Sequence, residues 1–326
     1  SSIFSDFSGV TLKAEFDNIE LQGNAHINLT QRNRQFQNNY LSSGSGRTLD
    51  VISSRVTLPQ YLRNTASQLN LSAKNSITMA YGSSIFSEAG SSISLTAENS
   101  IFVDGTISAP AGKIAMRIKA STGGDFDSNQ TLWLGEHAQL FARGAVKLDA
   151  NSIFRTGNVL DGGEISLITD RGYLVMEDGS TLDVSGTAAT LDVAINGAPS
   201  FGYQSTRVGS DAGSIKLVAA EGILLEGEMK GVGGTAINRD GSLIIELDRS
   251  NRNLPEDPGI PFPVNPLKIT VSQNLINNFT PSYAIGDVLD PLLTGQIAIS
   301  ADSLMRGGFD FIELTTPDTI QFKLNF

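Results

Sequence analysis

The chain has 326 residues, a formal net charge of −11 and no cysteine. The lack of cysteine excludes disulfides, thiolate chemistry and Cys-ligated zinc or iron–sulfur clusters. The negative charge argues against nucleic acid or an anionic membrane as a partner, because neither attracts an acidic surface. No apolar run is long enough for a transmembrane helix, which needs about 20 residues, so we expect no insertion into a membrane.

Residues 1–68 are predicted to form irregular coils or a cap that carries a polar loop. The stretch from Gln31 to Thr48 is rich in Gln, Asn, Arg, Ser and Gly and shows no alternation of apolar and polar residues. Such a composition is typical of a loop rather than of a strand.

Residues 69–250 carry a repeated pattern, in which an apolar-x-apolar triplet is followed by a Gly or Asn turn and a second short strand. With two later copies, the triplets begin at Leu69, Ile93, Ile114, Val146, Ile165, Ile215, Leu243, Leu267 and Ile297. A period of two predicts strands, and no stretch shows the spacing of a helix. Short strands without helical crossovers leave a sandwich or a β-helix. Because the triplets recur at a minimum spacing of about 20 residues, we predict an all-β fold, a right-handed parallel β-helix with coils of that length and loop insertions.

Two segments interrupt this pattern. Residues 187–211 separate two well-formed coils and contain Phe201 and Tyr203, so we predict an insertion that leaves the helix as a loop. Residues 251–266 contain five prolines, which exclude a central strand and predict an extended loop on the surface. Residues 267–326 return to the pattern and are predicted to form C-terminal coils of the β-helix.

Aromatic residues are the candidates for a carbohydrate-binding face, namely Trp133, Phe201, Tyr203 and Tyr283. An aromatic ring packs on the apolar face of a pyranose, while nearby Asn and Asp side chains bind its hydroxyl groups. Alternation points Leu132 and Leu134 inward and Trp133 outward, so we expect an exposed indole. The alternative is that the polar loop from Gly123 to Asn129 covers it.

Two aspartates are the candidates for a metal site. Asp125 and Asp127 place oxygen ligands in alternation, which suits Ca²⁺. The alternative is a hydrogen-bonded turn, because the segment lacks the glycine and the distal glutamate of an EF-hand loop. We expect no other cofactor.

No pattern typical of a catalytic site is present. Polysaccharide lyases and hydrolases built on β-helices need carboxylates and a basic residue on adjacent coils of one face. The Asp and Glu residues are scattered along the sequence, and the two histidines, His26 and His137, are far apart in it. Arg117 and Lys119 are expected to point outward on either side of an inward Ile118. We therefore predict that the protein is not an enzyme.

Four segments of the chain resemble the β-helical shaft of filamentous haemagglutinin-like exoproteins, large bacterial proteins exported by two-partner secretion. They are Gly162–Leu167, Gly179–Gly186, Ala212–Leu217 and Gly307–Leu314, and the resemblance covers residues 69–326. The N-terminal secretion domain of that family is not recognisable here. The resemblance implies a secreted protein, extracellular or on the bacterial cell surface, whose parent protein uses an outer-membrane secretion partner.

The resulting functional prediction is a segment of a large surface adhesin. It would act as an extended shaft and as a carbohydrate-binding face for host or bacterial polysaccharide, in adhesion, aggregation or biofilm. Two alternatives stay open: a polysaccharide lyase or hydrolase on a β-helix, and a ligand-free structural filament or spacer.

Overall fold

The computed structural model describes residues 7, 9–29, 34–35, 56–57, 66–120, 129–148, 154–197, 202–248, 267–274, 283, 287–289 and 293–323. They form an all-β structure with one short α-helix and one 3-10 turn. The Pro-rich segment 251–266 and the residues Asp125, Asp127 and Phe201 lie outside these ranges. No helix within them is long and apolar enough to cross a membrane.

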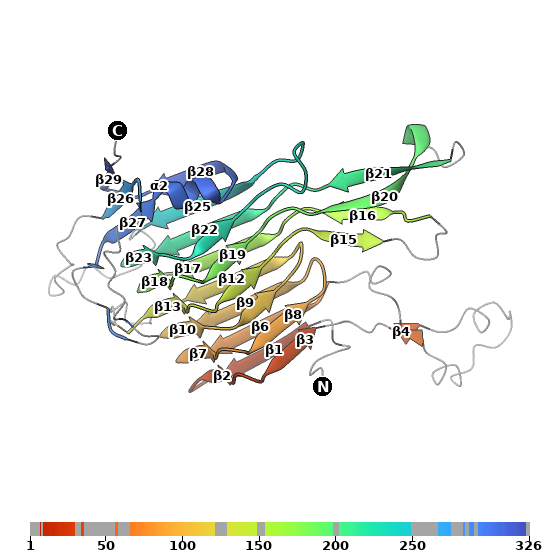
Figure 1. Cartoon of the computed structure of the whole chain (residues 1–326). Helices are drawn as coiled ribbons and strands as arrows, with labels where there is room; N and C mark the ends of the chain where they lie inside the picture. Colours follow the sequence, from red (N-terminus) through yellow and green to blue (C-terminus); the bar gives the residue numbers. More distant parts are fainter. Residues whose placement is uncertain are drawn as a thin grey trace.

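Three parallel sheets make up the body of the molecule (Figure 1). The first sheet has the order β1 (Gly9–Ala14), β6 (Gln68–Ala73), β9 (Ser92–Ala97), β12 (Lys113–Ile118), β17 (Glu164–Thr169), β22 (Ser214–Ala219), β25 (Gly241–Leu247) and β28 (Phe309–Thr315). The second has the order β2 (Ile19–Leu21), β7 (Ser76–Met79), β10 (Ser100–Val103), β13 (Thr131–Leu134), β18 (Tyr173–Met176), β23 (Gly222–Leu225), β27 (Gln296–Ser300), β26 (Lys268–Ser272) and β29 (Thr319–Lys323). The third has the order β24 (Glu228–Lys230), β19 (Thr181–Asp183), β14 (Gln139–Phe141), β11 (Thr106–Ser108), β8 (Ser84–Ser87) and β3 (His26–Leu29).

The chain visits the three sheets in turn. Strand β6 of the first sheet is followed by β7 in the second and β8 in the third, and β9 then pairs in parallel with β6. Figure 1 shows the resulting stack, which rises from β1, β2 and β3 at the bottom to β28 and β29 at the top. This arrangement is consistent with a parallel β-helix.

The hydrophobic core lies inside the stack, where the three sheets face one another. In the first sheet Leu69, Ile93, Ile114 and Ile165 occupy the same register on successive strands, and all are fully buried. Comparable columns from the second and third sheets join them in one continuous core cluster. The period-two alternation of the sequence therefore sorts side chains into the core as predicted for strands.

One of the expected coil triplets was assigned wrongly. The triplet at Val146 lies in β15 (Ala145–Leu148), which forms an antiparallel pair with β16 (Gly157–Leu160) outside the three sheets. The Val146 side chain is 39% exposed instead of buried in the core. A hairpin strand and a coil strand share the same alternation, and they differ only in their pairing partner, which the local sequence does not reveal.

The strand order of the second sheet reverses near the C-terminal end. The triplets at Leu267 and Ile297 belong to β26 and β27, so they lie in the second sheet and not in the first with the earlier triplets. Strand β27 pairs with β23, and β26 lies one position farther out, although it comes first in the sequence. After β27, helix α2 (Ala301–Arg306) packs against β24 and β27, and its first turn is capped by the Ser300 hydroxyl.

Two antiparallel hairpins project from the body. One is the β15–β16 pair, and the other joins β20 (Ala188–Ala194) to β21 (Tyr203–Gly209), with the 3-10 turn η3 (Ile195–Gly197) after β20. Figure 1 shows them side by side, extending to the right of the sheets. We call the described residues of 145–160 and 188–209 the arm. A further antiparallel pair joins β4 (Arg34–Gln35), within the stretch predicted as a polar loop, to β5 (Val56–Thr57), while β1, β2 and β3 of the same N-terminal region belong to the three parallel sheets.

Candidate functional site

An apolar stripe runs along the outer face of the second sheet. Phe102, Trp133, Val175 and Leu224 occupy the same register on β10, β13, β18 and β23. Their inward neighbours, such as Leu132 and Leu134, belong to the core. Alternation therefore predicted correctly that Trp133 points away from the core.

The prediction that Trp133 is exposed is wrong, because its side chain is only 1% exposed. Leu289 and the half-buried Tyr283 and Leu293 pack against the stripe and form a second apolar cluster with it. These three residues come from the chain between β26 and β27, about 150 residues after Trp133 in the sequence. The indole is thus covered by a segment that no local pattern relates to it.

A carboxylate holds the indole in place. Nε1 of Trp133 donates to Oε1 of Glu177 at 2.6 Å, and Oε2 of Glu177 accepts from the backbone N–H of Glu136 at 2.9 Å. Glu177 therefore ties the outer face of β13 to the turn that follows it. A buried indole N–H needs such an acceptor, since an unpaired donor away from water is costly.

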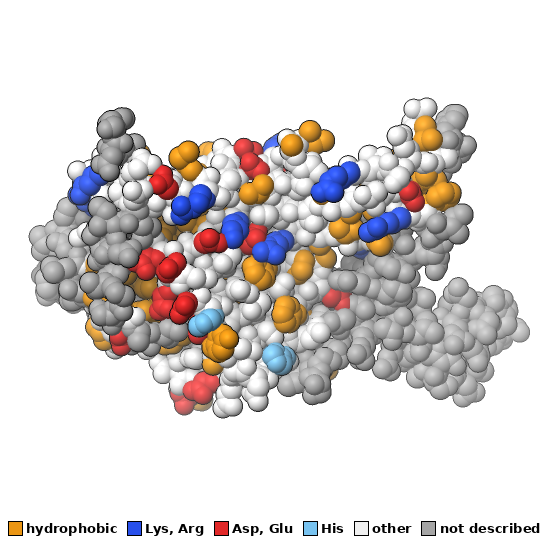
Figure 2. Space-filling view, viewed as in Figure 1, with side chains coloured by type: hydrophobic (Ala, Val, Ile, Leu, Met, Phe, Trp, Pro, Cys, Tyr) orange, Lys and Arg blue, Asp and Glu red, His pale blue; other side chains and the backbone are white. Residues whose placement is uncertain are grey.

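A cavity of about 300 Å³ opens between this stripe and its cover. Its apolar wall includes Trp133, Val175, Leu224, Tyr283 and Leu289. Its acidic wall is made of Glu136, Glu177, Asp178 and Glu226. Figure 2 shows acidic side chains gathered on this part of the surface, near β13 and β18.

The four carboxylates come from the turns that lead from the second sheet to the third. Each follows its strand within two residues: Glu136 after β13, Glu177 and Asp178 after β18, and Glu226 after β23. The sequence analysis missed them because the three turns follow one another at intervals of about 40 to 50 residues, and only the parallel stacking of coils brings them together. The signal that could have found them is an acidic residue directly after the same strand of each coil.

The surroundings of Glu226 perturb its pKa. Burial raises the pKa of Glu226 above its usual range, and the charges of Asp178 and Glu177 raise it further. Its Oε1 atom is buried and finds no hydrogen-bond partner among the described residues. The charged form of this side chain is therefore poorly solvated.

This environment predicts how Glu226 affects stability. Between the ordinary pKa of a glutamate and the raised value, the folded chain binds more protons than the unfolded chain, so stability falls as pH rises through that window. We expect Glu226→Gln to raise the melting temperature at pH 8, by roughly 1–2 °C, and to leave it unchanged at pH 4. Thermal unfolding at the two pH values measures this, with the exposed Glu20→Gln as control. An equal effect at both pH values would contradict it.

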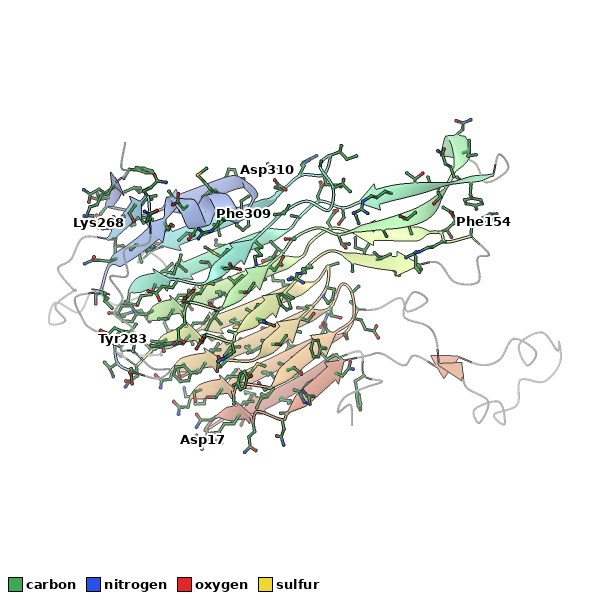
Figure 3. All side chains as sticks on the ribbon, viewed as in Figure 1. Asp17, Phe154, Lys268, Tyr283, Phe309 and Asp310 are labelled. Carbon is green, nitrogen blue, oxygen red and sulfur yellow. The ribbon has the colours of Figure 1, made fainter. Side chains whose placement is uncertain are left out.

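The other residues predicted to bind carbohydrate or metal do not lie together in one site. Tyr283 shares the cavity with Trp133, whereas Tyr203 lies on β21 of the arm. Figure 3 labels Tyr283 at the left of the stack and Phe154 at the tip of the arm. Phe201, Asp125 and Asp127 lie outside the described residues, so the structure does not place these three. Within the described ranges no three His, Asp or Glu side chains are arranged to hold a metal ion.

The arm carries an aromatic pair of its own. The rings of Phe154 and Tyr203 stack with centroids 4.2 Å apart and planes inclined by 26°. Phe154 is 41% exposed, and Val193 and Ile195 on the same arm are similarly open. The two hairpins are joined at Asp192, whose backbone N–H donates to the Arg155 carbonyl and whose carboxylate accepts from the Arg155 N–H.

The basic residues of the arm distinguish it from the acidic body. Lys147, Arg155 and Arg207 are all exposed on it. Figure 2 shows basic and hydrophobic side chains together in this region. The arm therefore carries exposed apolar groups beside cations.

The other polar residues singled out from the sequence have structural partners. Arg117 forms a two-pronged ion pair with Asp170 on the neighbouring coil. His26 contacts the Ser84 hydroxyl at 2.8 Å, and His137 contacts Asp104. Lys119 is exposed, whereas Ile118 between the two cations is buried, as alternation predicted.

Comparison of the chain with protein-family models, with curated proteins and with solved structures finds no match. A functional assignment therefore depends on the residues and the geometry of the chain itself.

Proposed function

We propose that the chain is a right-handed parallel β-helix that serves as the shaft of a secreted bacterial surface adhesin. Three observations support this: the chain visits three parallel sheets in turn, the strands stay in register from coil to coil, and one core runs through the stack. Such a solenoid is extended and resists bending, because each coil is bonded to its neighbours along every sheet. The resemblance to filamentous haemagglutinin-like exoproteins adds export through an outer-membrane secretion partner.

The adhesive element is the arm, and its ligand is a polysaccharide. The observation that carries this assignment is the stacked pair of Phe154, between β15 and β16, and Tyr203, on β21, which joins the two hairpins that project from the shaft. An exposed ring surface binds the apolar face of a sugar, and Arg155 and Arg207 supply donors for hydroxyl or carboxylate groups. Loops that leave a solenoid on one side are where such proteins place their binding surfaces.

The acidic cavity does not make the chain an enzyme in this proposal. A lyase or hydrolase needs a carboxylate that acts with a second catalytic group on a substrate exposed to it. The cavity brings together four carboxylates, but no Lys or Arg is among the described residues that line it. Its aromatic floor, Trp133, is buried and hydrogen-bonded to one of those carboxylates.

Retention of the purified chain on a panel of bacterial and host polysaccharides tests the adhesin. We expect Tyr203→Ala to weaken retention about tenfold, because a ring contact of about 1.4 kcal/mol corresponds to that factor. The control is Tyr81→Ala, since Tyr81 is 65% exposed on the body of the molecule. Equal retention of wild type and Tyr203→Ala would contradict the role of the arm.

Released reducing ends or unsaturated products, measured in the same wells, test the non-enzymatic assignment. We expect none. Product formation would establish a polysaccharide lyase or hydrolase instead. If the chain is not retained and forms no product, the function that is left is a ligand-free spacer.

A further inference from the structure

The cavity beside Trp133 has the features of a small-molecule binding site. Its floor is apolar and rigid, because Trp133, Val175 and Leu224 stand on three hydrogen-bonded strands of the second sheet. Its volume of about 300 Å³ lies at the lower end of the range for small-molecule sites. Convergent polar groups on one side of an apolar pocket are the usual arrangement of such a site.

In the described part of the chain, the carboxylates of this cavity have no cationic partner. Elsewhere on the same coils several acidic side chains have cationic partners: Glu164 pairs with Lys113, Asp170 with Arg117 and Asp183 with Arg143. Among the described residues, no Lys, Arg or His forms an ion pair with any carboxylate of the cavity, Glu136, Glu177, Asp178 or Glu226. Four negative charges beside an apolar wall create a potential that favours a cation.

A hydrogen-bond donor is missing as well as a charge. Oε1 of Glu226 is buried without a partner in the described part of the chain, and a buried carboxylate oxygen of this kind costs stability until a donor reaches it. An ammonium group offers three donors and a full positive charge. It would satisfy Glu226 and neutralise the repulsion from Asp178 and Glu177 at the same time.

The geometry points away from a metal ion. The carboxylates come from three successive coils, and no three of the described acidic or histidine side chains converge closely enough to coordinate one ion. Charges spread along a wall suit a longer ligand whose cationic end or ends meet them. The apolar floor suits an aliphatic body, and the aromatic rings of Trp133 and Tyr283 add to its attraction for an ammonium group.

We propose that this cavity binds a small organic cation with an aliphatic body, such as an alkyl diamine. The aliphatic part lies on Val175 and Leu224, and the ammonium group meets Glu226. This site is separate from the arm, so it does not depend on polysaccharide binding.

Trp133 is the sole tryptophan of the chain, so its fluorescence reports directly on the cavity. We expect 1,5-diaminopentane to change that fluorescence saturably, whereas 1,5-pentanediol, which has the same length and no charge, leaves it unchanged. Calorimetric titration with the same two compounds detects binding that does not alter the indole emission. Equal responses to both compounds, or no saturable response to the diamine by either method, would overturn the proposal.

Two variants test where the cation binds. We expect Glu226→Gln to weaken diamine binding about tenfold, because a charge-assisted hydrogen bond contributes roughly that factor. Glu164→Gln makes the same chemical change at an exposed glutamate of the first sheet, and we expect unchanged binding. If Glu226→Gln is more stable at pH 8 but binds normally, Glu226 is only a poorly solvated surface acid, and the proposal is wrong.

Discussion

Gly163→Ala is expected to destabilise the protein by roughly 3 kcal/mol, the upper part of the usual range for overpacking. A Cβ atom at Gly163 would lie 1.9 Å from the carbonyl oxygen and 2.7 Å from the nitrogen of Gly112. Both contacts are with the backbone of the preceding coil, which is held by the parallel pairing of β12 with β17. Neighbouring strands are about 4.8 Å apart, so there is no space between the two backbones for a methyl group.

The same constraint recurs on the next coil. A Cβ at Gly213 would lie 1.8 Å from the Gly163 carbonyl oxygen. The three glycines form a column at the corner where the third sheet leads into the first, and they let successive coils approach each other closely. The glycines in the segments that resemble the exoprotein family are therefore explained in this chain by the close packing of successive coils.

Chemical denaturation of the two variants Gly163→Ala and Gly9→Ala measures the effect. Gly9 lies in β1, and a Cβ there would meet nothing within 4 Å, so this variant controls for the loss of a glycine. We expect a lower midpoint for Gly163→Ala alone. Indistinguishable midpoints would mean that the coils can move apart at this corner, and the close stacking argument would fail.

Much of the fold was predictable because strands leave a signature within a few residues. The alternation at Leu132, Trp133 and Leu134 gave the strand and the directions of its side chains, and β13 has both. What local alternation does not contain is the partner of a strand. That is why Val146 was assigned to a coil although it lies in a hairpin, and why the reversed order of β26 and β27 was not foreseen.

The candidate site was much less predictable, since it depends on contacts between distant residues. Trp133 was identified as an outward aromatic, but its cover by Tyr283 and Leu289 follows from how the chain returns between β26 and β27. The carboxylates of the cavity looked scattered in the sequence. In a parallel stack, residues that are one coil apart in the sequence lie side by side in space. Glu177 and Glu226 are therefore neighbours, although no sequence motif joins them.

Glu221→Ala is expected to cost about 3–5 kcal/mol, because it breaks a buried ion pair. The carboxylate of Glu221 is fully buried and the Arg171 side chain is 7% exposed, with Nε and Oε1 2.9 Å apart. Its other oxygen accepts from the backbone N–H of Gly172. The substitution therefore removes the counter-charge of a buried guanidinium and the acceptor of a buried N–H at the same time.

Equilibrium unfolding of Glu221→Ala, Arg171→Met and the double variant Arg171→Met/Glu221→Leu separates these contributions. The exposed pair of Lys113 and Glu164 is the control, and we expect Glu164→Ala to cost less than about 1 kcal/mol. The double variant should recover much of the loss, since it removes both charges of the buried pair and fills the site with apolar atoms. If the double variant is as unstable as Glu221→Ala, the lost hydrogen bond to Gly172, and not the broken ion pair, determines the stability of this corner.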